Sequence, residues 1–375
     1  MQEIAQNWLV LQLTNSARML ALDSFLGDIP IFLFSLVGGV IADRMDRRKL
    51  LLMSQLIQMT SALTLAVLFG TNHIHKQQIW VILLSSFIVG TAQAFGGPAY
   101  SALVPSLVEK EDLPNAIALN SIQFNLARII GPVVGGFALK YVGAAWCFGL
   151  NAVSFVAVIY SLLSLHINFN PARTGESILT GMKQGIGFIR KQGAMETLVA
   201  IAFLMTALAI PLITFLPVFA KNVFHRDEIT YTWFLAASGA GAITGALTVA
   251  ALGNVKNKGS IALSMLMLLG VSIAGFSISH SVIASCLLLF VSGGVMTCAF
   301  AMIASLVQLI TPNDMRGRVM SVYNVAFRGG MPFGSVTTGW LVPIFTAPTV
   351  LSVNGLVLLT IGAYFLFVQR RVAAL

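Results

Sequence analysis

Apolar runs of about 20 residues recur along the whole chain, and each is long enough to cross the hydrocarbon core of a membrane as an α-helix. Short polar segments separate them. This pattern predicts eleven membrane-spanning helices, over residues 17–41, 50–70, 78–104, 114–139, 144–165, 198–223, 230–253, 260–278, 282–310, 318–345 and 348–368. Residues 1–13 are too short to span and lack the basic region that opens a signal peptide. We expect them to belong to a truncated first helix; a downstream start codon, a fragment and a genuinely short protein give the same pattern.

The composition places the chain in the same class. Of its 375 residues, 57% are hydrophobic and only 9% are charged. A soluble domain is usually about 45 to 50% apolar with about 25% charge. The expected fold class is therefore an all-α membrane protein, with the lipid bilayer as its solvent.

The positions of the charged residues explain the net charge of +9. The densest charged segment, residues 43–49, connects two predicted helices and must lie at a membrane surface, because a charge at the centre of the bilayer costs about 3 kcal/mol. If this segment is cytoplasmic, fifteen Lys and Arg residues lie on the cytoplasmic side and five on the outer side. That is the positive-inside bias, so the basic charge needs no nucleic-acid partner. The tryptophans fall at the outer helix ends, as an interfacial belt requires: Trp8, Trp80, Trp146, Trp233 and Trp340.

The chain divides into two halves. Residues 166–197 form the longest polar connection and are predicted to contain an amphipathic helix on the cytoplasmic surface. The N-terminal transmembrane bundle is expected over residues 1–165 and the C-terminal bundle over 198–375. The halves resemble each other: superposing Arg128 on Arg328 also superposes Ser121 on Ser321 and Pro132 on Pro332. Internal repeats of this kind are common in transporters, with the substrate site between them.

Two motifs connect the sequence to a known family. The segment Gly39-Val-Ile-Ala-Asp43-Arg44-Met-Asp-Arg47-Arg48 resembles the loop signature between helices 2 and 3 of the major facilitator superfamily. The run Gly131-Pro132-Val-Val-Gly135-Gly136 resembles the fifth-helix signature of its exporters. Residues 216–220 and 316–321 are similar to the branch that contains the enterobactin exporter and drug efflux pumps. The resemblance implies two pseudo-symmetric six-helix bundles with a complete first helix, and a monomer.

The loop signature implies a gate. Gly39 is expected to let the second helix end close to a neighbour, and Asp43 to accept hydrogen bonds from the amino end of the eleventh helix near Arg318, where the helix dipole favours an anion. Arg44, Arg47 and Arg48 are expected to add ion pairs. The alternative is that the loop only fixes membrane topology.

The exporter signature is expected to interrupt the fifth helix. Small residues allow close helix packing and proline allows a bend. In exporters such a run is linked to preventing leakage; ordinary packing is the alternative. One departure weakens any proton relay taken from relatives, because the fourth helix has Gly90-Thr91-Ala92-Gln93 where many proton-coupled relatives carry an arginine.

Ionisable residues within apolar spans are the candidate site. Asp28, Arg128 and Arg328 lie near the centres of their spans, and Glu3 would do so in a complete first helix. A carboxylate there can take up and release a proton, so Asp28 and then Glu3 are the proton-coupling candidates, with Asp23 a poorer one. The alternative is a permanent ion pair between Asp28 and Arg128 or Arg328.

The two arginines are also substrate-binding candidates, since guanidinium groups suit carboxylate, catecholate or phosphate oxygens. Polar side chains are expected to line the same cavity or to bond between helices: Gln93, Gln123, Asn125 and Asn324, with Gln2, Asn7 and Gln12.

The predicted function is proton-coupled export of an amphiphilic drug or siderophore-like molecule by alternating access, in a bacterial inner membrane with the C-terminus in the cytoplasm. Import of an anionic metabolite, or a non-transporting fragment or sensor, are the alternatives. The histidines and cysteines form no nucleophile or metal constellation, and no phosphate-binding loop is present, so we expect neither an enzyme nor a cofactor nor a metal site.

Overall fold

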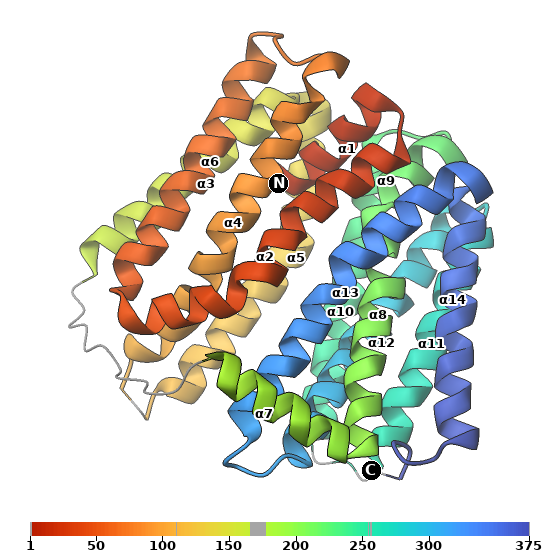
Figure 1. The fold of residues 1–375 in the computed structure, drawn as a ribbon. Helices are drawn as coiled ribbons and strands as arrows, with labels where there is room; N and C mark the ends of the chain where they lie inside the picture. The colour runs from red at the N-terminus through yellow and green to blue at the C-terminus, as the bar shows by residue number, and fades with distance from the viewer. Residues whose placement is uncertain (1, 110, 166–177, 254, 256, 375) are drawn as a thin grey trace. The chain divides into compact units, whose positions relative to one another are not determined.

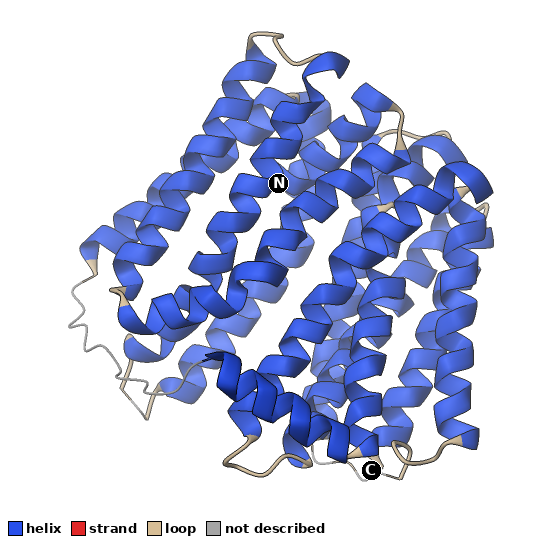
Figure 2. Cartoon of the chain, viewed as in Figure 1, coloured by secondary structure: helices blue, strands red, loops and turns tan. Residues whose placement is uncertain are grey.

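The computed structural model describes residues 2–109, 111–165, 178–253, 255 and 257–374. This part of the chain consists of helices joined by short turns, without a strand (Figures 1 and 2). Contacts divide the chain into two units, residues 1–176 and 177–375. The division falls within the predicted linker, of which residues 166–177 lie outside the described part.

The first unit contains six α-helices. They are α1 (Gln2–Thr14), α2 (Ala17–Arg44), α3 (Arg47–Gly70), α4 (Ile79–Leu103), α5 (Leu113–Tyr141) and α6 (Ala144–Ser164). Short 3₁₀ turns, η1 (Lys76–Gln78) and η2 (Val104–Ser106), flank α4.

The second unit opens with the short helix α7 (Ile178–Lys191) and continues with a second set of long helices. These are α8 (Gly193–Thr214), α10 (Glu228–Leu252), α11 (Lys258–Ile278), α12 (Val282–Leu309), α13 (Arg316–Phe345) and α14 (Ala347–Ala363). The turn α9 (Leu216–Val218) and the π-helical turn η3 (Phe219–Val223) follow α8, and a second π-helical turn, η4 (Tyr364–Val368), follows α14.

Side-chain caps explain where several helices begin. Ser16 Oγ accepts the Met19 backbone N–H at the start of α2, and Asp46 Oδ1 accepts that of Arg48 at the start of α3. Asp227 caps α10 in the same way. Each cap satisfies one backbone donor that the first helical turn leaves open. The turns between spans are therefore encoded locally.

Ten described helical segments are long and apolar enough to cross a membrane, and they account for ten of the eleven predicted spans. The protein is a multi-pass membrane protein. The remaining predicted span, over residues 318–345, corresponds to α13. This helix is continuous over 30 residues but is less apolar, since it carries Arg316, Arg318 and Arg328. It is long enough to cross a bilayer at 1.5 Å per residue.

The two units pair their helices in the same way. In the first, α2 packs against α4, and α3 against α4 and α6. In the second, α10 packs against α12, and α11 against α12 and α14. The predicted pseudo-symmetry of the two bundles is confirmed. The counterparts α1 and α8, which pack on α5 and α13, differ in length at 13 and 22 residues.

Glycines set the closest helix contacts. A Cβ on Gly90 of α4 would lie 2.1 Å from the Gly27 carbonyl oxygen of α2, and one on Gly38 would lie 2.2 Å from that of Ala94. In the second unit, a Cβ on Gly241 would lie 1.8 Å from the Phe290 oxygen. These backbones touch only because no side chain intervenes, as is typical of helix pairs in membranes.

Two expectations about the helices need correction. α5 is continuous through Pro132, so the exporter signature does not interrupt it. Trp8 is buried, at 7% exposure, and so does not belong to an interfacial belt, whereas the other four tryptophans are 52 to 60% exposed. Burial of Trp8 follows from the packing of α1 on α2, α5 and α6.

The helix α7 lies within the predicted linker, in the second of the two units. Its Ile189 is buried, and Gly185 lies against the Arg318 backbone of α13, where a Cβ would be 2.7 Å from the carbonyl oxygen. α7 also packs on α8. This helix is therefore part of the second unit's packing.

Replacing Gly90 with alanine is expected to lower the stability of the first unit by about 1–3 kcal/mol, because the new methyl group meets the backbone of α2. The measurement is the temperature at which the detergent-solubilised protein loses its monodisperse elution peak. Gly97→Ala on the same helix is the matched control, since its Cβ would meet no atom within 4 Å. Equal melting temperatures for the two variants would contradict the prediction.

Candidate functional site

A buried carboxylate lies where three helices of the first unit meet. Asp23 of α2 is only 3% exposed, and its neighbours Gln6 of α1 and Ser86 of α4 are 8% and 7% exposed. α1 and α4 both pack against α2 at this level of the bundle. The three polar side chains are enclosed by apolar helices, where each needs a hydrogen-bond partner.

The three side chains bond to one another. Gln6 Nε2 donates to both carboxylate oxygens of Asp23 at 3.0 Å and also lies 2.5 Å from Ser86 Oγ. Ser86 Oγ donates to Asp23 Oδ1 at 2.5 Å and is 3.2 Å from the Ile82 carbonyl oxygen. Among the described residues, Asp23 has neutral donors and no basic partner. We call Gln6, Asp23 and Ser86 the carboxylate cluster.

The second unit has no such cluster at the corresponding place among its described residues. In both units a serine of the third long helix bonds to one of the fourth: Ser61 to Ser85 at 2.6 Å, and Ser292 to Ser272 at 2.9 Å. The residue after Ser85 is Ser86, which donates a hydrogen bond to Asp23. The residue after Ser292 is Gly293, where a Cβ would lie 2.0 Å from the Ser238 carbonyl oxygen. The carboxylate cluster therefore distinguishes the first unit from its counterpart.

The carboxylates predicted from the sequence lie in different surroundings. Asp28 is half-buried and Glu3 is exposed, so Asp23, the poorest of the three sequence candidates, is the most buried. Depth in the span alone favoured Asp28. Burial depends on which side of α2 faces α1 and α4, and the sequence does not give that.

The predicted substrate residues are placed as follows. Gln93 and Gln123 are exposed in the first unit, and Asn324 and Arg328 are exposed on α13 of the second. The side chains of Asn125, Arg128 and Asp43 lie outside the described part. Because the two arginines belong to different units, their sharing one cavity stays a prediction. Gln2 bonds between helices, its Oε1 accepting from Asn151 Nδ2 of α6 at 2.8 Å.

Sequence reasoning missed Gln6 and Ser86. Gln6 lies one helical turn after Glu3, a spacing that places the two on one side of α1. Ser86 is one of two adjacent serines in an apolar helix, and serine is too common in such helices to stand out. Their significance comes from the contact with Asp23.

The loop signature holds two helix ends in place. Arg47 Nη1 donates to the Ala102 carbonyl oxygen at the end of α4, at 3.0 Å. Arg48 donates through Nε and Nη2 to the carbonyl oxygens of Leu162 and Leu163 at the end of α6, both at 2.6 Å. Guanidinium groups satisfy carbonyls that the last helical turn leaves open, and their charge suits the negative end of the helix dipole. These bonds lie within the first unit; the gate that the loop signature implies stays a prediction.

Two glycine expectations need correction in the described structure. The close contact expected of Gly39 is made by Gly38, one residue earlier, and a Cβ on Gly39 would meet no atom within 4 Å. In the exporter signature, Gly131 likewise has open space, while Gly135 and Gly136 are buried. The Gly135 carbonyl accepts from the buried Cys147 Sγ at 3.7 Å. Close packing is thus confined to the second half of that run.

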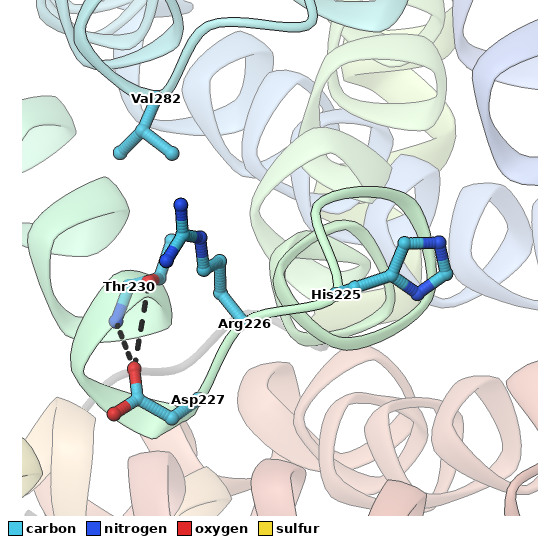
Figure 3. A pocket seen from close by; sticks show the side chains of 5 residues that line it. All are labelled: His225, Arg226, Asp227, Thr230 and Val282. Carbon is cyan, nitrogen blue, oxygen red and sulfur yellow. Dashed lines mark hydrogen bonds between the residues drawn. The ribbon is translucent and has the colours of Figure 1, made fainter.

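A surface pocket of about 640 Å³ opens where the turn before α10 meets the start of α12, lined by His225, Arg226, Asp227, Thr230 and Val282 (Figure 3). Figure 3 shows Arg226 extending toward Val282, while His225 points away from it. Asp227 is occupied in capping Thr230. No residue predicted from the sequence to bind substrate or protons lines this pocket.

The paired helix bundles and charge-poor spans are those of a membrane transporter of the major facilitator type. The chain belongs to the family of transmembrane secretion effectors in that superfamily, whose model matches residues 1–374. The resemblance seen in the loop and fifth-helix motifs is confirmed.

Characterised relatives extend over nearly the whole chain. It is 25% identical to the multidrug efflux pump Tap of Mycolicibacterium fortuitum over 98% of this chain and 91% of Tap. It is 26% identical to the enterobactin exporter EntS of Escherichia coli O1:K1 over 95% of this chain and 84% of EntS.

Solved transporters share the fold. A variant of the nucleoside transporter NupG matches with a TM-score of 0.77 at 14% identity, over 97% of this chain and 94% of that one. A POT family transporter in complex with 5-aminolevulinic acid matches with a TM-score of 0.75 at 13% identity, over 98% and 93%.

Replacing Arg48 with glutamine is expected to destabilise the first unit by about 1–2 kcal/mol, because the α6 carbonyls lose charged donors. The measurement is the thermal midpoint of the detergent-solubilised protein. Lys49→Gln removes the same charge from an exposed neighbour and should leave the midpoint unchanged. A similar loss in both variants would mean that the loop's charge, and not the Arg48 bonds, is what stabilises the unit.

Proposed function

We propose that this protein is a secondary active exporter that moves amphiphilic small molecules out of the bacterial cytoplasm in exchange for protons. The match of the secretion effector family over residues 1–374 carries the proposal. Two relatives that align over nearly the whole chain are named as a drug efflux pump and a siderophore exporter. Both names favour export over the import of a metabolite.

Proton coupling is supported by ionisable side chains within the apolar spans. A buried carboxylate is costly in its charged form, so a transporter that alternately exposes it to each side of the membrane can load and unload a proton there. Asp28 and Glu3 are the candidates from the sequence, and Asp23 is the most buried carboxylate of the three. In this mechanism the inward proton gradient supplies the energy, and the protein acts as a transporter and not an enzyme.

The substrate is proposed to be an amphiphile with an anionic or catecholate group. Arg128 and Arg328, one in each unit, would bind such a group by paired guanidinium hydrogen bonds. Gln93, Gln123, Asn125 and Asn324 would contribute neutral hydrogen bonds. The aliphatic and aromatic residues of the spans would accept the apolar part of the molecule.

The charge distribution supports a membrane orientation for the proposed transporter. The proposed orientation has the loop at residues 43–49 and the C-terminus in the cytoplasm of a bacterial inner membrane, and the excess of fifteen basic residues over five on that side supports it. The proposed transporter works as a monomer. Asp43 would meet the amino end of α13 when the cytoplasmic side closes.

Inside-out vesicles test the function directly. With an imposed acid interior, wild-type protein is expected to accumulate a fluorescent drug or a catecholate siderophore above the level seen without the gradient. Asp28→Asn is expected to abolish the gradient-dependent part if Asp28 carries the proton, whereas Asp314→Asn, in an exposed turn, should not. Absence of gradient-driven uptake by the wild type, with a correctly inserted protein, would contradict proton-coupled export of these substrates.

The substrate class is tested by replacing the arginines. Arg328→Gln is expected to weaken uptake of the anionic catecholate by roughly tenfold or more, since a charge-assisted hydrogen bond is lost, and to spare a cationic dye. The measurement is the concentration for half-maximal uptake of each compound. Arg328→Lys keeps the charge without the planar fork and should be intermediate. Equal effects on both compounds would argue against anion binding at Arg328.

A further inference from the structure

We propose that the carboxylate cluster of Gln6, Asp23 and Ser86 is the proton-binding site of the transporter, with Asp23 carrying the proton and Ser86 reversing its hydrogen bond when the proton binds. This inference rests on the proposed function, because it names the residues that perform its proton exchange. It differs from the ranking by depth in the span, which put Asp28 first.

Burial without a cation makes Asp23 suited to exchange a proton. A charged group inside apolar helices is tolerated when a basic residue neutralises it, and such a fixed pair titrates little. Asp23 instead accepts from the Gln6 amide and the Ser86 hydroxyl, both neutral. Binding one proton removes a buried charge and separates no ion pair among the described residues.

The charged groups that the structure describes on the surrounding helices place no cation beside the cluster, and the charge that acts on Asp23 is the like charge of Glu3. On α2, Arg18 lies more than one turn before Asp23, and Asp28 is five residues after it. On α1, Glu3 is the only charged residue and is exposed. α4 carries no charged residue, and α3 has basic residues only at its start, Arg47 to Lys49.

The cluster satisfies its polar atoms in both protonation states. When Asp23 is charged, Ser86 donates its hydrogen to Oδ1. When a proton binds to Oδ1, the new O–H donates to Ser86 Oγ, and the Ser86 hydrogen turns to the Ile82 carbonyl oxygen, which is already 3.2 Å away. Gln6 continues to donate to Oδ2. One proton is gained, and no buried donor or acceptor is left without a partner.

The position of the cluster connects the proton to helix packing. Gln6 and Ser86 lie on α1 and α4, so a change at Asp23 is transmitted to three helices of the first unit. In the second unit, the corresponding position is filled by Gly293 packed directly against the α10 backbone. Close packing at this place therefore does not require polar side chains, and the cluster serves another purpose.

Infrared spectroscopy of the purified protein in lipid nanodiscs tests the site without any substrate. The wild type is expected to show the carbonyl stretch of a protonated carboxylic acid, which disappears as the pH is raised. Asp23→Asn should lose this titrating band, and Asp28→Asn should keep it. Retention of the band in Asp23→Asn, or its loss in Asp28→Asn alone, would overturn the proposal.

Variants of Ser86 test whether this serine reverses its hydrogen bond when Asp23 is protonated. They also test the proton site if Asp23→Asn does not fold. Ser86→Ala removes a donor to the charged carboxylate, so the midpoint of the band should move to higher pH by about one pH unit, the equivalent of one hydrogen bond. Ser86→Thr keeps the hydroxyl and should restore the wild-type midpoint. Ser85→Ala is the matched control, because it removes the adjacent buried hydroxyl that bonds Ser61 and not Asp23. Equal midpoints for Ser86→Ala and Ser85→Ala would overturn the role of Ser86.

The vesicle assay separates this inference from the proposed function. If the gradient drives uptake in the wild type and equally well in Asp23→Asn, export by proton exchange stands and the site assignment fails. If the infrared band follows Asp23 and Ser86 but the gradient drives no uptake, the proton site stands and the proposed function fails. Loss of both the band and the gradient-dependent uptake in Asp23→Asn, with both retained in the exposed-turn variant Asp314→Asn, is the expected result.

Discussion

The cost of leaving a polar group without a partner in hydrocarbon governs this protein at every level. Water is absent from the bilayer core, so each spanning segment must satisfy its own backbone, and helices do this within a single segment. The same cost keeps charge out of the spans and collects it at their ends, where Ser16, Asp46 and Asp227 open helices and Arg47 and Arg48 close them. Among the described buried side-chain nitrogen and oxygen atoms, all except Ser335 Oγ have a hydrogen-bond partner.

The loop signature is a consequence of this constraint as well as a mark of the family. Arg47 and Arg48 reach the last carbonyls of α4 and α6, so one short loop fixes the ends of two helices distant in sequence. Beside it, Ala42, Leu50, Leu51, Ala99, Leu103 and Leu162 form a buried apolar cluster. This end of the first unit is therefore tied together by hydrogen bonds and packing. A rigid unit is what a transporter needs if its two halves move as bodies.

The two units show how a repeated fold acquires a site in one copy. Their helices pair alike, and each has a serine–serine bond between its third and fourth long helices. Next to that bond in the second unit, Gly293 packs directly against the backbone of α10. At the corresponding place in the first unit, Ser86 forms hydrogen bonds with Asp23 and Gln6. The difference between Gly293 and Ser86 at this position thus corresponds to the difference between simple backbone packing and a polar cluster that links three helices.

The sequence by itself determined the membrane class, ten of the spans and the family, because hydropathy, charge position and short motifs are local properties. It also identified polar residues within the spans, but it could not show that Asp23 is the most buried carboxylate of the three candidates or that Gln6 and Ser86 bond to it. Only the tertiary structure decided which side of α2 is enclosed, that Gly38 and not Gly39 touches α4, and that α5 passes through Pro132 without a break. In a chain whose helices are apolar all round, the periodicity of polar residues says little about which face packs inward, so burial is settled by the contacts between helices.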